Sequence, residues 1–259
     1  APNKPRNDMA GQHRPANLYN GVLSPIIGYG IRGAIWYQGE TNAVRGHAYR
    51  ETFPLMIQSW RQAWAQGDFP FYWVQLADFR NEVTEPGDSD WAELRESQTL
   101  TLDKLSNVGE AVIIDAGEGR DIHPRNKQIV ANRLLRHALA KDYGQTVPHQ
   151  SPRYQSMEIK GDKILLSFDS VDGSLYCFDS KTAFGISICG EDQKFVRAEA
   201  KIVDKDKVEV WSESVPSPIA VRYAWADNPL CNLYDKIGAV TLPVTPFRTD
   251  NFALTTTGK

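Results

Sequence analysis

Hydrophobic and polar positions follow two alternating periods from about residue 18 to residue 144. Segments with apolar residues three or four positions apart, the spacing of one helix face, alternate with short continuous apolar runs typical of buried strands. This alternation favours an α/β fold built on a parallel sheet. The pattern predicts helices over residues 18–29, 49–66, 90–105 and 124–143, the last with Pro124 at its first position, and strands over residues 31–37, 69–76 and 110–115.

The pattern changes after Gly144. A connection with two prolines at residues 145–154 leads into short apolar runs separated by Gly, Asp and Pro, which predict a β-rich segment. We therefore expect a polar leader at residues 1–16, an α/β/α core at residues 17–149 and a β-rich segment at residues 150–259.

Polar residues are concentrated where two of the predicted strands end. The strand at residues 31–37 runs into Gln38-Gly39-Glu40-Thr41-Asn42, and the strand at residues 110–115 leads to Asp121 and His123. Ligands of parallel sheets bind beyond the carboxyl ends of the strands, so we expect both clusters at one edge of the sheet. Each cluster alone is equally compatible with a tight turn, whereas the two together favour a functional site.

Asp121 and His123 are half of a hydrolytic triad. A carboxylate near a histidine fixes the tautomer of the imidazole and stabilises the imidazolium that forms when the ring accepts a proton. The other histidines carry less weight, since His137 falls within a predicted helix and the remaining three lie in polar surroundings.

Composition and charge exclude several other classes of protein. The 259 residues, 41% of them apolar, are enough for one large or two modest domains. The net charge of -3 is spread without blocks, so we expect no nucleic-acid partner and no anionic membrane surface as partner. No apolar run approaches the roughly 20 residues of a membrane span, and residues 1–15 lack the apolar region of a signal peptide.

The three cysteines do not predict a metal site. Cys177, Cys189 and Cys231 lack the short paired spacing of zinc ligands, and there is no glycine-rich phosphate loop, so we expect no metal and no cofactor. In an oxidising compartment, Cys177 and Cys189 fall in neighbouring predicted strands and are able to pair. Three buried thiols are the simpler interpretation.

Motifs along nearly the whole chain resemble those of the sialate O-acetylesterase family, carbohydrate esterases of the SGNH hydrolase superfamily. The two strand-end motifs, WYQGE-x-N and DIHP-x-NK, are the most specific in this order and at this separation. The full set is PANLYNG, IRGAIWYQGETNA, FPFYWVQLADF, WAELRESQ, DIHPRNK, AVRYAWADNP and PFRTD.

The resemblance implies a three-layer α/β/α sandwich and a metal-independent serine esterase that removes O-acetyl groups from sugars, typically from sialic acid, in the periplasm or outside the cell. It implies that His123 is the general base and that Asp121 orients it. Gln38 and Gly39 are then expected to line the oxyanion hole. Glu40 cannot donate while ionised, so we expect it to orient a neighbour or contact substrate hydroxyls, and Asn42 joins the same substrate-binding set.

One element of the family pattern is missing from this sequence. The family carries its nucleophilic serine in a Gly-Gln-Ser-Asn-Met motif at the end of the first strand. Gly11-Gln12-His13 begins like that motif but has histidine at the position of the nucleophile, and Ser24, Ser59 and Ser97 lie in helical patterns. We therefore expect an upstream segment or a companion chain to supply the first strand and the serine, and this chain alone to be inactive.

Two alternatives remain open from the sequence. The first alternative to a sialate O-acetylesterase is a non-catalytic, carbohydrate-binding relative. The second is an acetylesterase that acts on plant polysaccharide rather than on sialic acid. A sialic acid carboxylate favours a bidentate arginine, for which Arg120, Arg125 and Arg222 are the candidates.

Overall fold

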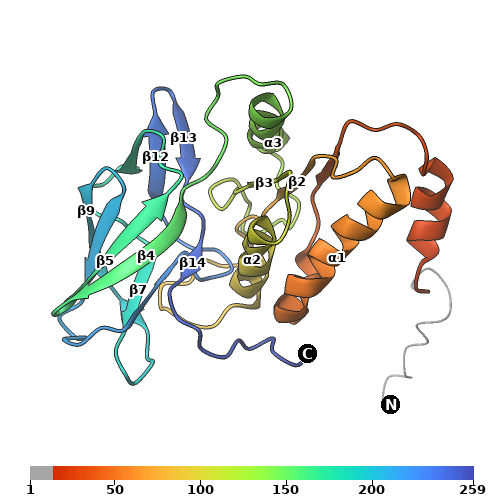
Figure 1. Ribbon diagram of the computed structural model, residues 1–259. Coiled ribbons are helices and arrows are strands. Elements are labelled where there is room, and N and C mark those ends of the chain that lie inside the picture. Colours follow the sequence, from red (N-terminus) through yellow and green to blue (C-terminus); the bar gives the residue numbers. More distant parts are fainter. Residues whose placement is uncertain (1–13) are drawn as a thin grey trace, which may run out of the picture.

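The computed structural model describes residues 14–259. Most of the expected polar leader, including Gly11-Gln12-His13, lies outside the described residues. Figure 1 shows a helical part beside a β-rich part, with the C-terminal segment returning from the β-rich part to the helices. Among the described residues, no helix is long and apolar enough to cross a membrane.

A three-stranded parallel sheet lies at the centre of the helical part, in the order β1-β2-β3. Its strands are β1 (Ala34–Trp36), β2 (Phe71–Val74) and β3 (Val108–Ala111). Every residue of β2 and β3 is buried, as expected for parallel strands covered on both faces. The predicted parallel sheet is confirmed, although the strands are shorter than predicted and β3 begins two residues before the expected Glu110.

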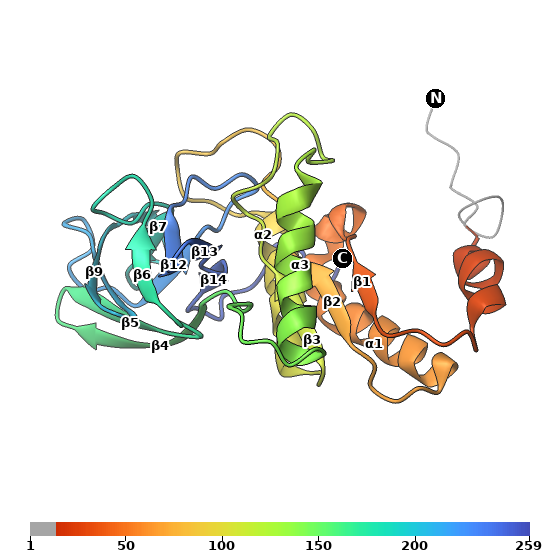
Figure 2. The same ribbon diagram turned by 90° about the horizontal axis from the view of Figure 1, so that it is seen from above.

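Helices cover the sheet from both sides (Figure 2). Phe71 and Trp73 of β2 pack against two helices on one face, whereas Tyr72 and Val74 pack against one helix on the other. Successive strand side chains point to opposite faces, so one buried strand serves two cores. The first face is covered by α1 (Gly46–Trp64) and α2 (Asp90–Leu100), with η5 (Thr101–Asp103) after it, and the second by α3 (Lys127–Lys141).

The predicted helix boundaries differ from the observed ones: α1 spans residues 46–64 instead of 49–66, and α2 ends at residue 100 instead of 105. The last helix begins at Lys127 and not at Pro124, because Asn126 caps it: Oδ1 of Asn126 accepts the backbone N–H of Ile129 at 3.3 Å. The helix predicted over residues 18–29 consists of a π-helical turn and a 3₁₀ turn without a buried residue. These turns are η2 (Tyr19–Leu23) and η3 (Ser24–Ile26).

The β-rich part contains three antiparallel sheets around the largest apolar core, which confirms the predicted change of character. The strand orders are β4-β5-β10-β9, β14-β11-β7-β8 and β13-β12-β6. The strands are β4 (Arg153–Lys160), β5 (Lys163–Asp169), β6 (Ser174–Cys177), β7 (Ile186–Cys189), β8 (Val196–Arg197), β9 (Glu199–Asp204), β10 (Lys207–Trp211), β11 (Ala220–Tyr223), β12 (Leu233–Ile237), β13 (Val240–Pro243) and β14 (Phe247–Arg248).

Cys177 and Cys189 do not form a disulfide. Cys177 lies in β6 and Cys189 in β7, which belong to different sheets, and both are buried free thiols. Cys231 is also free. The prediction of three buried thiols is therefore confirmed for Cys177 and Cys189, whereas Cys231 is half-buried.

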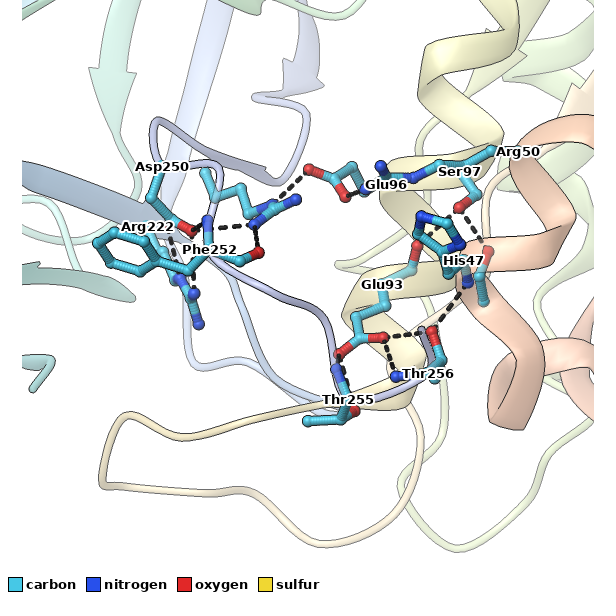
Figure 3. A network of polar contacts seen from close by, with 12 residues as sticks. His47, Arg50, Glu93, Glu96, Ser97, Arg222, Asp250, Phe252, Thr255 and Thr256 are labelled. Carbon is cyan, nitrogen blue, oxygen red and sulfur yellow. Dashed lines mark hydrogen bonds and ion pairs between the residues drawn. The ribbon is translucent and has the colours of Figure 1, made fainter. Parts of the chain in front are cut away.

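Polar contacts join the C-terminal segment to α2 (Figure 3). Glu93 of α2 accepts hydrogen bonds from the backbone N–H and the hydroxyl of both Thr255 and Thr256. Arg248 donates to Glu96 of α2 at 2.7 Å and to Asp250 at 2.9 Å. Because a buried carboxylate needs such donors, these contacts hold the β-rich part against the helices.

Candidate active site

The segments that follow the three parallel strands meet at one edge of the sheet. Tyr37 follows β1, and the Nζ atom of Lys127, at the start of α3, lies 4.9 Å from the centre of its ring. Asp78 follows β2 and accepts the backbone N–H of Gly117, in the segment after β3, at 2.6 Å. The structure therefore brings together the regions around the two polar clusters.

The turn after β1, η4 (Glu40–Arg45) together with Gln38 and Gly39, is held by side chains of two helices. Oε1 of Gln38 accepts the hydroxyl of Tyr49 at 3.0 Å, and Nε2 of Gln38 donates to Oδ1 of Asn42 at 2.9 Å. Gln98 of α2 donates to the backbone carbonyl of Gln38 at 3.3 Å. The turn is therefore positioned by the protein before any substrate arrives.

The two expected oxyanion donors differ in availability. The backbone N–H of Gly39 donates to Oε2 of Glu40 at 2.9 Å, so this donor is engaged. This contact is compatible with a role of Glu40 in orienting its neighbour, which stays a prediction. The amide nitrogen of Gln38 carries two hydrogens. One is donated to Asn42, which leaves the second for a further acceptor.

His123 and Asp121 lie close together on the loop before α3. Nδ1 of His123 is 3.8 Å from Oδ1 of Asp121, and the same oxygen accepts the backbone N–H of His123 at 2.9 Å. The separation of 3.8 Å exceeds hydrogen-bond distance, although catalytic hydrogen bonds are commonly longer in unliganded enzymes. The imidazole is 84% exposed, so it is open to a reacting group.

Asp78 is a member of this edge that the sequence reasoning did not identify. Burial raises the pKa of Asp78, and the charge of Asp115 acts in the same direction, whereas the hydrogen bond from Gly117 opposes them. Burial, together with the charges of Glu40 and Asp78, raises the pKa of Tyr37 to about 12. Asp78 lies two residues beyond the end of the strand predicted over residues 69–76, so the strand-end rule applied to the middle strand would have found it.

The arginine candidates for a sugar carboxylate have different surroundings. Arg222 is buried and pairs with Asp250 through two hydrogen bonds of 2.8 and 3.1 Å. Nε of Arg125 lies 3.7 Å from Glu118. Arg120 is exposed and adjoins Asp121 in the chain. Arg222 is therefore neutralised, whereas Arg120 is exposed and forms no ion pair with another described residue.

No metal cluster accompanies these groups in residues 14–259, which contain no grouping of three or more His, Cys, Asp or Glu able to hold an ion. The acidic residues near the loop have other partners. Asp115 accepts two hydrogen bonds from Arg133 of α3, at 2.5 and 2.7 Å, and Glu118 accepts the backbone N–H of Arg125 at 2.7 Å. These contacts fix the loop that carries Asp121 and His123.

The chain is similar in sequence and in fold to known carbohydrate esterases. Residues 13–140 match the model of the family described as "Carbohydrate esterase, sialic acid-specific acetylesterase". The chain belongs to this family, as its relatives also indicate.

The similar proteins are esterases by name. The chain is 29% identical to the sialate O-acetylesterase of Homo sapiens over 94% of this chain and 50% of that protein. It is 31% identical to the Mus musculus sialate O-acetylesterase over 92% of this chain and 48% of that protein. A crystal structure of a carbohydrate acetylesterase from Xanthomonas citri matches with a TM-score of 0.83 and 43% identity, over 91% of this chain and 54% of that one. The chain thus spans about half the length of the curated relatives it matches.

Proposed function

We propose that this chain forms the part of a carbohydrate O-acetylesterase that carries the general base and the oxyanion turn, within an SGNH-like three-layer sandwich. The observation that carries the proposal is the meeting of the strand-end segments at one edge of the sheet. His123 accepts the proton of a serine hydroxyl as it attacks the acetyl carbonyl, and Asp121 stabilises the imidazolium. The free hydrogen of the Gln38 amide donates to the developing oxyanion.

The serine is proposed to come from an upstream segment or a companion chain. Within the described residues β1 pairs only with β2, so its other edge is open. Ile35, in the middle of β1, is 73% exposed, and Leu18 and Val22 of the first turns are 77% and 60% exposed. Parallel strands are normally covered on both faces, and open edges attract further strands. An added strand that carries the serine fits both features.

The sugar is proposed to be an O-acetylated sialic acid, in the periplasm or outside the cell. The names of the curated relatives support this substrate, and Arg120 is the open arginine beside Asp121. An acetylated plant polysaccharide is the alternative substrate. A non-catalytic, carbohydrate-binding role is the alternative function, and it predicts no hydrolysis under any condition.

Hydrolysis of p-nitrophenyl acetate and of an O-acetylated sialic acid tests the proposal. Both are measured with this chain alone and with the upstream segment added. We expect activity only with the upstream segment, and a loss of at least about 1,000-fold in His123→Ala, because triad residues contribute on this scale. His47→Ala, at the start of α1, is the matched control and should retain activity. Full activity of the chain alone would contradict the divided site.

A further inference from the structure

Two adjoining cavities lie where the helical and β-rich parts meet. The larger has a volume of about 510 Å³ and the smaller about 230 Å³. Pro86, Ser187 and Trp225 line both, so the two cavities adjoin, and we call them together the junction groove. The larger cavity falls within the size range of small-molecule sites, roughly 300 to 1,000 Å³.

The walls of the junction groove are mainly apolar and include exposed side chains. Phe184 is 52% exposed, Leu230 50% and Val83 48%, and all three line the larger cavity. Trp225 is buried at the shared wall, with the guanidinium of Arg222 5.2 Å from the centre of its ring. Apolar walls with a few polar groups suit a ligand that has both apolar faces and hydroxyl groups.

Both arginines that line the junction groove are paired with carboxylates. Arg197 lies 3.4 Å from Glu85, and Arg222 pairs with Asp250 at 2.8 Å. Asp88 adds a further acidic side chain to the wall of the smaller cavity. No arginine of the groove is left to neutralise an anionic ligand, so its charge fits a neutral one.

The junction groove adjoins the loop of the candidate base. Gly119, two residues before Asp121, packs so closely that a Cβ atom there would lie 2.7 Å from the carbonyl oxygen of Arg80 and 2.9 Å from Nδ2 of Asn228. Pro229, the residue after Asn228, lines the larger cavity. The loop that carries Asp121 and His123 therefore packs against the segment that lines the groove.

We propose that the junction groove binds the neutral sugars of the glycan chain that carries the acetylated residue. The sugar rings place their C–H faces on Phe184 and Leu230, and their hydroxyl groups face Ser187 and the Arg197–Glu85 pair. The inference rests on the proposed function for the kind of ligand, but it concerns a separate surface, and binding there requires neither the serine nor His123.

Saturation-transfer NMR on this chain tests the proposal with neutral oligosaccharides, namely lacto-N-neotetraose and hexasaccharides from xylan, mannan and β-glucan, and with free N-acetylneuraminic acid as the acidic probe. We expect at least one neutral oligosaccharide to bind at least fivefold more tightly than N-acetylneuraminic acid. Phe184→Ala should weaken that binding at least fivefold. Phe178→Ala is the control, because Phe178 is 62% exposed on the same β-rich part but does not line the groove. Circular dichroism confirms that both variants fold.

Three results would overturn the inference: no binding of any neutral oligosaccharide, equal loss in both phenylalanine variants, or N-acetylneuraminic acid binding as tightly as the best neutral probe and losing that binding in Phe184→Ala. Failure of the proposed function has a different signature. If neutral sugars bind in a Phe184-dependent manner but no ester is hydrolysed even with the upstream segment, the result supports sugar binding in the junction groove and contradicts the proposed esterase function. Hydrolysis that depends on His123, without any binding of neutral sugars, supports the proposed esterase function and contradicts sugar binding in the junction groove.

Discussion

Glu110 is a single buried carboxyl group in the parallel sheet that makes the stability of the protein depend on pH. It is 1% exposed and accepts hydrogen bonds from Nε1 of Trp73 at 3.0 Å and from the hydroxyl of Thr99 at 2.8 Å. Burial raises the pKa of Glu110 from 4.5 to about 7, although the two hydrogen bonds oppose the shift. The folded protein therefore keeps this proton at pH values where the unfolded chain has lost it.

The first prediction compares the wild type with Glu110→Gln. Because the folded-state pKa of Glu110 is raised, its contribution is most favourable below pH 4.5 and is lost as pH rises to about 7. Relative to the variant, we expect the free energy of unfolding of the wild type to fall by about 3 kcal/mol across this window. Urea unfolding at several pH values measures the difference. The other titrating groups, including buried His137, are common to both proteins, so parallel pH curves would contradict the prediction.

At the scale of single elements, the turn after β1 depends on Gly39. Its φ angle is 150°, and a Cβ atom there would lie 2.9 Å from Cδ2 of Leu94 and 3.3 Å from Nε2 of Gln98. We predict that Gly39→Ala lowers the free energy of unfolding by about 1–3 kcal/mol, through backbone strain and this contact. Urea unfolding measures the loss. Gly21→Ala is the control, because nothing lies within 4 Å of a Cβ atom at that position, and an equal loss there would refute the explanation.

The elements themselves were largely predictable from the sequence, and their ends were not. Periodicity predicted β1, β2, α1 and α2, since buried strands and amphipathic helices impose a fixed spacing on apolar residues. The predicted start of α3 at Pro124 was wrong because the side chain of Asn126 caps the helix, and the spacing of apolar residues carries no information about such a contact.

In the candidate site, too, some residues were predictable from the sequence, whereas the contacts between them were not. Gln38, Asp121 and His123 follow strands and were proposed from sequence. The contact between Lys127 and Tyr37, and the hydrogen bond from Gly117 to Asp78, join residues far apart in the chain. Such contacts are set by how the strands pair. They become visible only when the sheet order is known.

At the scale of the whole molecule, one hydroxyl group links three segments that are distant in sequence. Oγ1 of Thr256 donates to Glu93 of α2 at 2.5 Å and accepts the backbone N–H of His47 of α1 at 2.8 Å. We predict that Thr256→Val lowers the free energy of unfolding by about 1–3 kcal/mol, because it removes one of the four donors to the buried carboxylate of Glu93 and takes the acceptor away from the backbone N–H of His47. Thermal or urea unfolding measures the change. Thr257→Val, at an exposed neighbour, should stay within about 0.5 kcal/mol, and similar losses in both variants would rule out this explanation.

The open edge of β1 gives a prediction that separates stability from assembly. Ile35 is 73% exposed. It lies on β1, which among the described residues pairs only with β2. Ile35→Glu should therefore change the free energy of unfolding of this chain by only about 0.5 kcal/mol. If an upstream segment covers this strand, the same change buries a charge in the completed molecule, which is costly without a partner. We therefore expect Ile35→Glu to reduce esterase activity restored by the upstream segment at least tenfold. Ile159→Glu, on β4 at 51% exposure, should leave it unchanged. Equal restored activity in both variants would mean that the upstream segment joins the chain elsewhere, because a charge in the centre of a covered strand cannot escape the interface.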